Sequence, residues 1–218
     1  YDKKVVEGKE QFSNLELAKT RAAALKQKSI ENLDKYLIEF EANFIKRGGK
    51  VIWATDAEEA VKEALQIMKK AKTKTVVKAK SMATEEINFN EALEEQGIES
   101  IETDLGEYIV QLRKEPPYHI VTPAMHLSKE EVAKTFNEKK QTPIEFTPEQ
   151  ITNFVREELR LRYSKAEVGV SGANFLIADV GAIAITENEG NGLMSAAFPK
   201  IQIAIVGIEK VIPSIADV

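Results

Sequence analysis

The sequence of 218 residues contains no cysteine and only two histidines. The absence of cysteine excludes disulfide bonds, cysteine nucleophiles and thiolate-bound iron–sulfur clusters within these residues. Two histidines, His119 and His126, are too few for a histidine-rich metal site, so we assign no metal ligand. No apolar run approaches the roughly 20 residues that span a bilayer, and no signal-peptide pattern begins the chain. We therefore expect a cytoplasmic protein without a membrane partner.

The chain also lacks a concentrated basic surface. Lysine and arginine contribute 30 residues against 35 aspartates and glutamates, which gives a formal charge of -5. The basic residues are scattered, so nucleic-acid binding is disfavoured. Hydrophobic residues make up 43% of the chain, which suits one compact domain. Because the sequence starts at Tyr1 instead of methionine and stops soon after an apolar run, we expect it to be a piece of a longer protein.

The hydrophobic pattern predicts an α/β fold. Apolar residues recur at helical spacing from Leu15 to Phe44, which predicts a long amphipathic helix that ends at Gly48-Gly49. Short apolar strands then alternate with helices, and the strands are expected at residues 50–55, 75–80, 98–103, 118–122 and 201–208. Helices are expected at residues 57–72, 84–96, 107–112 and 148–164, and another helix is expected after Ser128, with capping signals at Asp56, Ser128 and Thr147.

Such alternation is typical of a mixed, largely parallel sheet sandwiched by helices. The apolar, glycine-punctuated last third of the chain predicts additional strands with an antiparallel portion. We expect two regions, an N-terminal helical extension at residues 1–48 and an α/β domain at residues 49–218.

Several polar residues are expected at the carboxyl ends of the parallel strands, where open α/β sheets bind ligands. Lys80 and Ser81 end the strand at 75–80, and a lysine beside a helix N-terminus suits an anion, although Ser81 could simply cap the helix. Glu107 follows the next strand and could form an acid/base pair with His119. A lone histidine in an apolar strand is more often a core residue, and His126, which follows that strand, is better placed at the crevice.

A glycine-rich loop at residues 186–192 is a second candidate. Its glycines free backbone N–H groups for a ligand, so the loop could form an anion-binding nest. A tight turn between strands is the alternative, because the glycine order matches neither the Walker nor the Rossmann pattern. The candidate ligand-binding residues of this loop are Glu187, Asn188, Glu189, Gly190, Asn191 and Gly192.

Small and polar residues also interrupt the apolar run at 168–186. Gly172 could permit a close backbone approach, and Asn174 could orient a substrate carbonyl or satisfy a buried backbone group. Asp179 is a carboxylate in an apolar neighbourhood, which indicates either a functional group or, as we slightly favour, a hydrogen-bonding hub at a bend. No residue is identified as catalytic.

Read together, these segments resemble a known family. The relevant stretches are KSMATEEI at 80–87, ETDLGEYI at 102–109, YHIVTPAMH at 118–126, GVSGANF at 169–175, TENEGNG at 186–192 and AIVGIEK at 204–210. They resemble the LUD domain of the lactate-utilisation protein B family over residues 15–213. The resemblance implies a fold similar to the sugar-phosphate isomerase and CoA-transferase-like group.

The resemblance also implies a role in oxidising L-lactate to pyruvate, together with companion lactate-utilisation subunits. In that family, cysteines in ferredoxin-like segments after the LUD domain carry [4Fe–4S] clusters, so no cofactor is expected in these residues themselves. A stand-alone protein resembling the smaller lactate-utilisation protein C is the alternative. The family has no settled mechanism, so no catalytic role is transferred.

Three classes of function follow from this. The first is a ligand-binding or subunit-docking module for electron transport, which could hold a small anion while redox chemistry occurs elsewhere. The second is a stand-alone enzyme resembling CoA transferases, sugar-phosphate isomerases or folate cyclo-ligases, for which Glu107, Asp179, Glu187 and Glu189 are the carboxylate candidates. The third is a scaffold whose N-terminal helix mediates homo-oligomerisation.

Overall fold

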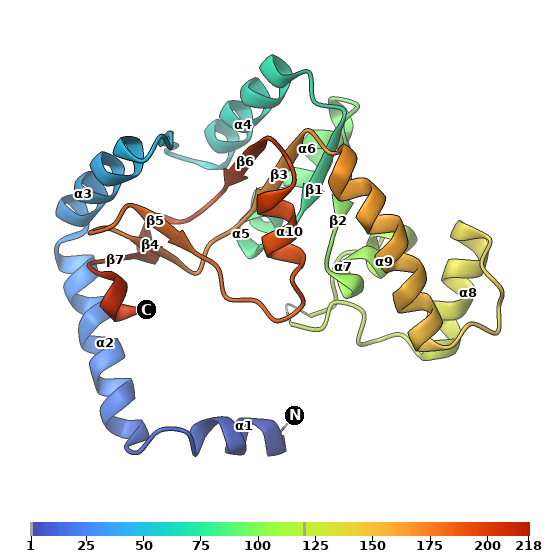
Figure 1. The fold of residues 1–218 in the computed structure, drawn as a ribbon, viewed down its shortest axis with the longest axis horizontal. Helices are drawn as coiled ribbons and strands as arrows, with labels where there is room; N and C mark the ends of the chain where they lie inside the picture. Colours follow the sequence, from blue (N-terminus) through green and yellow to red (C-terminus); the bar gives the residue numbers. More distant parts are fainter. Residues whose placement is uncertain (1, 120) are drawn as a thin grey trace. The chain divides into compact units, whose positions relative to one another are not determined.

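The computed structural model describes residues 2–119 and 121–218 (Figure 1). The chain forms two compact units. The first unit combines Tyr1–Val51 with Asn174–Ala184 and Gly207–Val218, and the second combines Ile52–Ala173 with Ile185–Val206. The chain therefore enters each unit more than once, and each unit is described by itself.

The first unit packs helices against a small sheet. Its strands β4 (Phe175–Ile177), β5 (Ala182–Ala184) and β7 (Val211–Ile212) are arranged in the order β5-β4-β7. Strand β4 is antiparallel to β5 and parallel to β7. The helices of this unit are α1 (Asp2–Lys9), α2 (Leu15–Glu31), α3 (Leu33–Lys46) and the 3-10 turns η1 (Ile208–Lys210) and η2 (Ile215–Asp217).

A polar side chain and a glycine fit helix α3 against the turn between β4 and β5. The Asn43 amide donates a hydrogen bond of 2.8 Å to the Ala178 carbonyl. Gly181 lies in this turn with a φ of +57°, and a Cβ at Gly181 would overlap the backbone of Asn43 and Phe44. Glycine is therefore required there by both torsion and space.

The expected continuous helix from Leu15 to Phe44 is two helices that are separated at Asn32. Asn32 leaves helical torsions, with a φ of -125° and a ψ of 35°, and its amide donates to the Lys28 carbonyl at 2.9 Å. Asparagine side chains compete with the helical backbone for such hydrogen bonds. The apolar spacing predicted the helical regions but not this interruption.

The second unit contains a parallel sheet with the strand order β2-β1-β3-β6. The strands are β1 (Thr75–Lys78), β2 (Glu99–Glu102), β3 (Val168–Ser171) and β6 (Ile201–Ala204). The helices are α4 (Ala57–Ala71), α5 (Met82–Glu86), α6 (Phe89–Glu95), α7 (Leu105–Arg113), α8 (Lys129–Lys140), α9 (Pro148–Lys165) and α10 (Asn191–Ala197). The expected α/β class with a largely parallel sheet is confirmed, and the antiparallel pairing lies in the sheet of the first unit.

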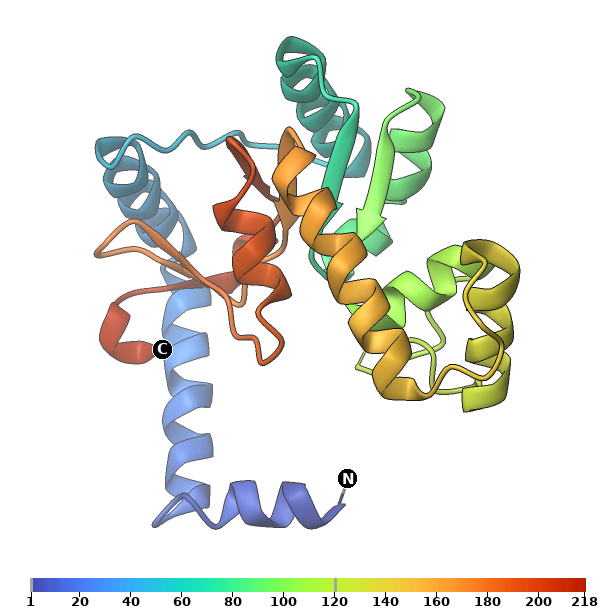
Figure 2. The same cartoon turned by 45° about the vertical axis from the view of Figure 1, so that its right-hand side comes forward.

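Alternate residues of strand β1 contribute to two cores, because side chains of a strand alternate between its faces. Val77 packs with Tyr108, Phe136 and Val155 of α7, α8 and α9, which Figure 2 shows gathered together. Val76 belongs to the other core, which includes residues of α4 and α6. Lys78 follows at the end of the strand on the Val76 face.

The capping signals at Asp56, Ser128 and Thr147 are confirmed, since each side chain accepts a hydrogen bond from the first turn of its helix. The strand expected at 50–55 is wrong: this segment has no strand pairing, and Ile52 and Trp53 are exposed. The strand expected at 118–122 is also wrong for its described residues, which form a loop, whereas Ile120 lies outside them.

Two further boundaries differ. The helix expected at 84–96 is divided into α5 and α6 by Asn88, which has a left-handed φ of +51°. The strand expected at 201–208 ends at Ala204. Across the described residues, we find no helix with both the length and the hydropathy needed to cross a membrane.

Gly169 of β3 provides a test of how closely this strand packs against helix α10. A Cβ at Gly169 would overlap the Ser195 carbonyl oxygen of α10 and would lie 2.6 Å from Gln202 Oε1. We expect Gly169→Ala to lower the free energy of unfolding by at least about 2 kcal/mol, because a close-packed backbone must move. Urea unfolding measures the loss. Gly8→Ala is the control, since nothing lies near its Cβ; equal stability of both variants would contradict the packing.

Candidate functional site

A fully buried lysine lies at the carboxyl end of strand β1. Lys78 has an exposed fraction of 0%. The parallel register places it directly beside Glu102, the last residue of β2, whose exposed fraction is 2%. A buried charge is costly unless it is paired, so this pair requires compensation from its surroundings.

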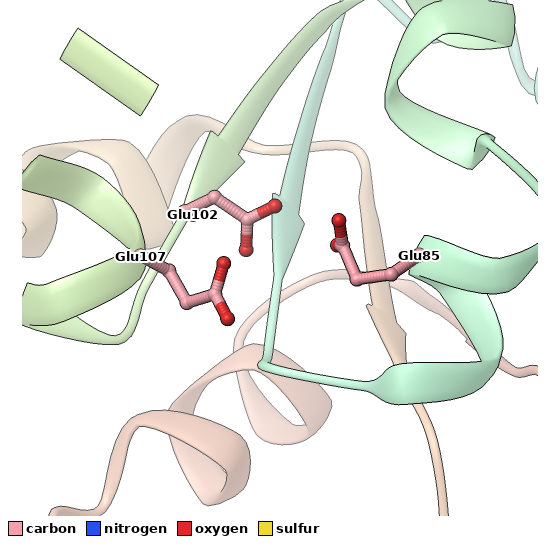
Figure 3. A group of neighbouring side chains, drawn as sticks. All are labelled: Glu85, Glu102 and Glu107. Atoms are coloured by element: carbon pink, nitrogen blue, oxygen red, sulfur yellow. The ribbon is translucent and has the colours of Figure 1, made fainter. Parts of the chain in front are cut away.

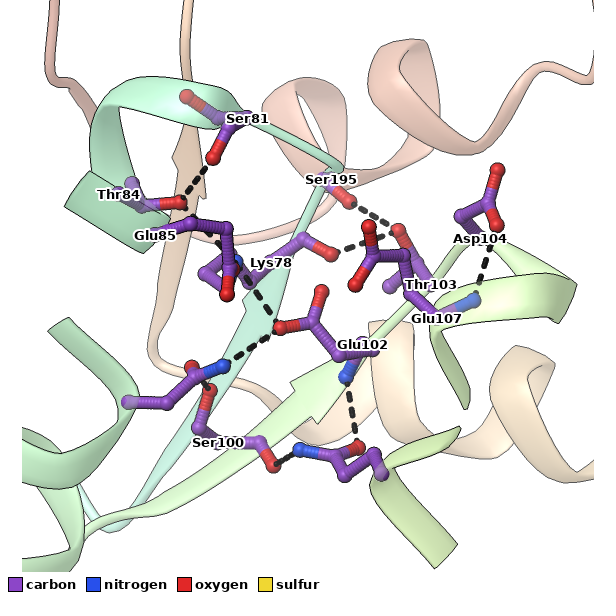
Figure 4. Close-up of polar contacts among 12 residues, drawn as sticks. Lys78, Ser81, Thr84, Glu85, Ser100, Glu102, Thr103, Asp104, Glu107 and Ser195 are labelled. Carbon is purple, nitrogen blue, oxygen red and sulfur yellow. Dashed lines mark hydrogen bonds and ion pairs between the residues drawn. The ribbon is translucent and has the colours of Figure 1, made fainter. Parts of the chain in front are cut away.

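The Lys78 ammonium group uses its three donors within this cluster (Figure 4). It lies 2.8 Å from Glu85 Oε1, 2.9 Å from Glu102 Oε1 and 3.0 Å from Thr84 Oγ1. Glu85 and Thr84 come from the short helix α5, which begins directly after the β1 end. The pKa of Lys78 is raised: burial lowers it, but the two carboxylates outweigh burial. Lys78 is therefore an ammonium ion.

Polar side chains also hold Glu102 in place. Asn90 of α6 donates to Glu102 Oε1 at 2.8 Å, and Gln111 of α7 accepts from the Glu102 backbone N–H at 3.1 Å. Ser100 is bonded to both supporting amides. Glu102 Oε2 is buried and has no hydrogen-bond partner among the described residues. Burial raises the pKa of Glu102, and Lys78 and Asn90 oppose that change.

Glu107 adds a third carboxylate to the cluster. It lies in the first turn of α7, where its backbone N–H donates to Asp104, the capping residue, at 3.0 Å. Its exposed fraction is 4%. Burial and then the charges of Glu102 and Glu85 raise the pKa of Glu107 to about 7. Glu107 can therefore exchange a proton near neutral pH.

Three hydroxyl groups lie next to these charged groups. Thr103 Oγ1 donates to the Lys78 carbonyl at 2.9 Å and lies 3.3 Å from Ser195 Oγ, which has an exposed fraction of 0%. Tyr163 of α9 interacts with both hydroxyl groups, and burial raises its pKa. Contacts among these hydroxyl groups connect the ends of strands β1 and β2 with helices α9 and α10.

The structure brings several of the expected site residues to this edge. Lys80 Nζ lies 3.1 Å from Asp104 Oδ2. A Cβ at Gly172 would lie 2.6 Å from Ser81 Oγ, so the expected close approach at this glycine is made by Ser81. Burial raises the pKa of Glu189. The charge of Asp104 raises this pKa further and the charge of Lys80 lowers it, so the 187–192 loop lies within electrostatic range of Asp104 and Lys80.

The glycine-rich loop already provides partners for its own helix terminus. Glu187 Oε2 accepts from the Leu193 N–H at 3.0 Å, and Asn191 Oδ1 accepts from the Gly192 N–H at 3.0 Å. Gly190 adopts a left-handed φ of +81°, whereas Asn188 is exposed. Two of the backbone N–H groups that an anion would need are thus bonded to side chains. The loop therefore has fewer free N–H donors for an anion than its glycine content suggested.

The remaining expected residues have other surroundings. His126 lies 3.2 Å from Glu115 Oε2 and packs against the Tyr118 ring. His119 is exposed instead of lying in a strand, and its Nδ1 accepts from the Val121 N–H. Asn174 belongs to the first unit. The described residues do not show the expected pair of His119 with Glu107, because His119 is exposed in a loop, whereas Glu107 is buried.

Asp179, also in the first unit, is exposed instead of buried. Its Oδ1 accepts from the Ile215 N–H at 3.1 Å. This contact joins the turn after β4 to η2 and agrees with the structural role that the sequence slightly favoured.

Sequence reasoning missed Lys78, Glu85 and Glu102. Lys78 occupies a position in an alternating strand where a lysine normally faces solvent, and no local spacing links it to Glu102. The available signal was a charged residue near the end of each of two consecutive predicted strands, Lys78 in 75–80 and Glu102 in 98–103. Parallel pairing of those strands in register would have placed the two residues side by side.

The arrangement favours proton or cation chemistry over capture of a bare anion. Both ammonium groups at this edge, Lys78 and Lys80, are already paired with carboxylates. Among the described residues, Glu107 forms no ion pair with an ammonium group, and Glu189 adds further negative charge nearby. A carboxylate ligand would meet more like charge than opposite charge here.

Removal of each ammonium group tests its role. Lys78→Met leaves the buried Glu102 and the part-exposed Glu85 without their counterion, so we expect a loss of about 3–5 kcal/mol in the free energy of unfolding. Lys80→Met is the matched control, because its pair with Asp104 is part-exposed and should contribute no more than about 1 kcal/mol. Urea unfolding distinguishes them; similar small losses would show that Lys78 carries no buried charge.

The raised pKa of Glu107 predicts how stability depends on pH. The folded state holds a proton up to about pH 7, whereas the unfolded carboxyl loses it near its ordinary pKa of 4.5. Stability should therefore fall as pH rises through this interval, by up to about 3 kcal/mol from this group. Glu107→Gln should remove this part of the decline. Urea titrations of both proteins in metal-free buffer measure it, and parallel pH profiles would contradict the assignment.

Comparison with known proteins agrees with the resemblance noted in the sequence. The LUD domain family matches residues 37–218. Lactate utilization protein B of Bacillus velezensis is 42% identical over 209 residues, which cover 95% of this chain and 44% of the relative. The proteins of that name from Bacillus cytotoxicus and Bacillus cereus are 41% identical over 208 residues, with the same coverage. No solved structure matches. The chain spans less than half of these relatives, and it belongs to the LUD domain family.

Proposed function

We propose that this chain acts in lactate utilisation, as the LUD domain of a complex that oxidises L-lactate to pyruvate. The observation that carries the proposal is its 42% identity, across 95% of its length, to a lactate utilization protein B. Since the chain covers 44% of that relative, we assign the oxidation to the whole complex and a supporting role to this domain.

The chain itself is not suited to hold the redox centres. Iron–sulfur clusters are bound mainly by cysteine thiolates, and this sequence has none. The carboxylates and hydroxyls at the sheet edge are hard oxygen ligands that do not fit such a cluster. We therefore place the [4Fe–4S] clusters of the complex outside these residues, and no electron-transfer step is assigned to them.

Within that complex, the geometry favours subunit docking over direct lactate capture. The ammonium groups near the carboxyl end of the sheet are paired, so a lactate carboxylate would find no unpaired cation among them. The loop after α7 lies beside this edge, since Lys80 Nζ contacts the Val121 carbonyl at 3.3 Å. That loop exposes Tyr118, Val121 and Met125, each by more than half. Exposed apolar side chains in one loop are typical of an interaction surface.

One observation favours an enzyme as the second candidate. Glu107 is a buried carboxyl with a pKa of about 7, which suits a general acid or base. A stand-alone enzyme would resemble the CoA transferases, sugar-phosphate isomerases or folate cyclo-ligases that the sequence resemblance implies. Incubation of the isolated chain with CoA thioesters, sugar phosphates and formylated folates would then show turnover that Glu107→Gln abolishes.

A chimera tests the lactate-utilisation role. This chain would replace the matching segment of the Bacillus velezensis protein in a strain that lacks its own copy. We expect growth on L-lactate as sole carbon source, because the domain supplies the same docking function. A chimera that is soluble and loaded with iron but supports no growth would contradict the role.

The docking role has its own variant. Tyr118→Ser combined with Val121→Ser and Met125→Ser should reduce co-purification of the companion subunits at least tenfold and slow growth, while the iron content stays unchanged. A control with Ile144→Ser and Leu161→Ser changes exposed apolar residues of other segments and should retain binding. Equal binding by both variants would exclude the loop as the docking surface.

A further inference from the structure

Three glutamates from three different elements face one another in the second unit (Figure 3). Glu85 comes from α5, Glu102 from β2 and Glu107 from α7. Each can supply one carboxylate oxygen such that the three oxygens lie within 4.8 Å of one another. Like charges at this separation repel strongly in a buried environment, so the cluster needs positive charge to balance it.

Lys78 supplies only part of that balance. Its ammonium group carries one positive charge, whereas the three ionised carboxylates carry three negative charges. Its donors are used by Thr84 Oγ1, Glu85 Oε1 and Glu102 Oε1, which leaves none for Glu107. The ionised cluster therefore has a net charge of about -2 by the ordinary charges of these groups. One divalent cation would neutralise it.

The unpartnered oxygen of Glu102 is an independent indication of a ligand. Lys78 and Asn90 both contact Oε1, whereas Oε2 is fully buried and has no partner among the described residues. Buried polar atoms without a partner are rare, and an ion or a water is a common explanation. This finding concerns hydrogen bonding and does not follow from the closeness of the three carboxylates.

We propose that Glu85, Glu102 and Glu107 bind one hard divalent cation of the Mg²⁺, Mn²⁺ or Ca²⁺ class, with Glu102 Oε2 as a central ligand. Oxygen is the preferred ligand atom of these ions, and oxygens on opposite sides of such an ion are roughly 4–5 Å apart. The separations in the cluster are compatible with that range. The Glu85 side chain is 28% exposed, so the site has an open side through which a cation can enter.

This site was not expected from the sequence, to which we assigned no metal ligand. It also does not depend on the proposed role in lactate utilisation, because it uses the charges and contacts of this chain alone. A single proton shared by Glu102 and Glu107 is the competing explanation for the unpartnered oxygen. The two explanations differ in whether a metal binds.

Calorimetric titration with Mn²⁺ at pH 7.5 tests the proposal. The unmodified chain, first treated with a chelator, should bind one Mn²⁺, and excess Mg²⁺ or Ca²⁺ should compete. Glu107→Gln and Glu85→Gln should each weaken binding at least tenfold, since each removes one charged ligand. Glu145→Gln is the matched control, because it removes the same charge from an exposed position and should bind normally.

Circular dichroism checks that each variant is folded. If Glu107→Gln does not fold, Glu85→Gln still tests the site, because Glu85 is part-exposed and its substitution should be tolerated. The absence of Mn²⁺ binding to the folded, unmodified chain at millimolar concentration would overturn the proposal and favour the shared proton. Binding that both ligand variants retain would also overturn it, because the cation would then lie elsewhere.

Discussion

The charge of Lys78 is the constraint on which the second unit depends. An ammonium ion with no exposed surface must be compensated, and its two carboxylate partners come from the adjacent strand and the following helix. The strand register, the position of α5 and the amide of Asn90 all serve that compensation. Specificity is a recognised use of such buried charges, because a shift of the register would separate the ions.

Lys78 does not balance all of the negative charge around it, because three carboxylates surround one ammonium group. In the part of the chain that the structure describes, Glu107 has no ammonium partner, and burial together with the neighbouring carboxylates raises its pKa to about 7. A folded domain does not need this third carboxylate for the Lys78 pair. Glu107 lies in the first turn of α7, where the helix dipole favours a carboxylate, and Asp104 already caps the helix.

The local parts of this fold could be predicted from the sequence. Helix starts at Asp56, Ser128 and Thr147 depend on a hydrogen bond from the backbone N–H three residues away, and the predictions there were correct. Predictions that needed distant partners were less successful. The apolar segment at 50–55 resembles a strand, but a strand exists only where a neighbour accepts its hydrogen bonds, and sequence alone does not reveal that neighbour.

The candidate site shows the same division. Lys80 and Ser81 were predicted at the sheet edge because they end a strand, and both lie there. Lys78 was missed, since only the pairing of β1 with β2 brings it to Glu102. His126 was predicted at the edge because it follows the strand expected at 118–122, whose described residues form a loop. Anomalous diffraction from crystals grown with Mn²⁺ tests this metal site most directly. We expect one anomalous peak between Glu85, Glu102 and Glu107. A structure without this peak, in which carboxyl oxygens of Glu102 and Glu107 form a direct hydrogen bond, would contradict the site.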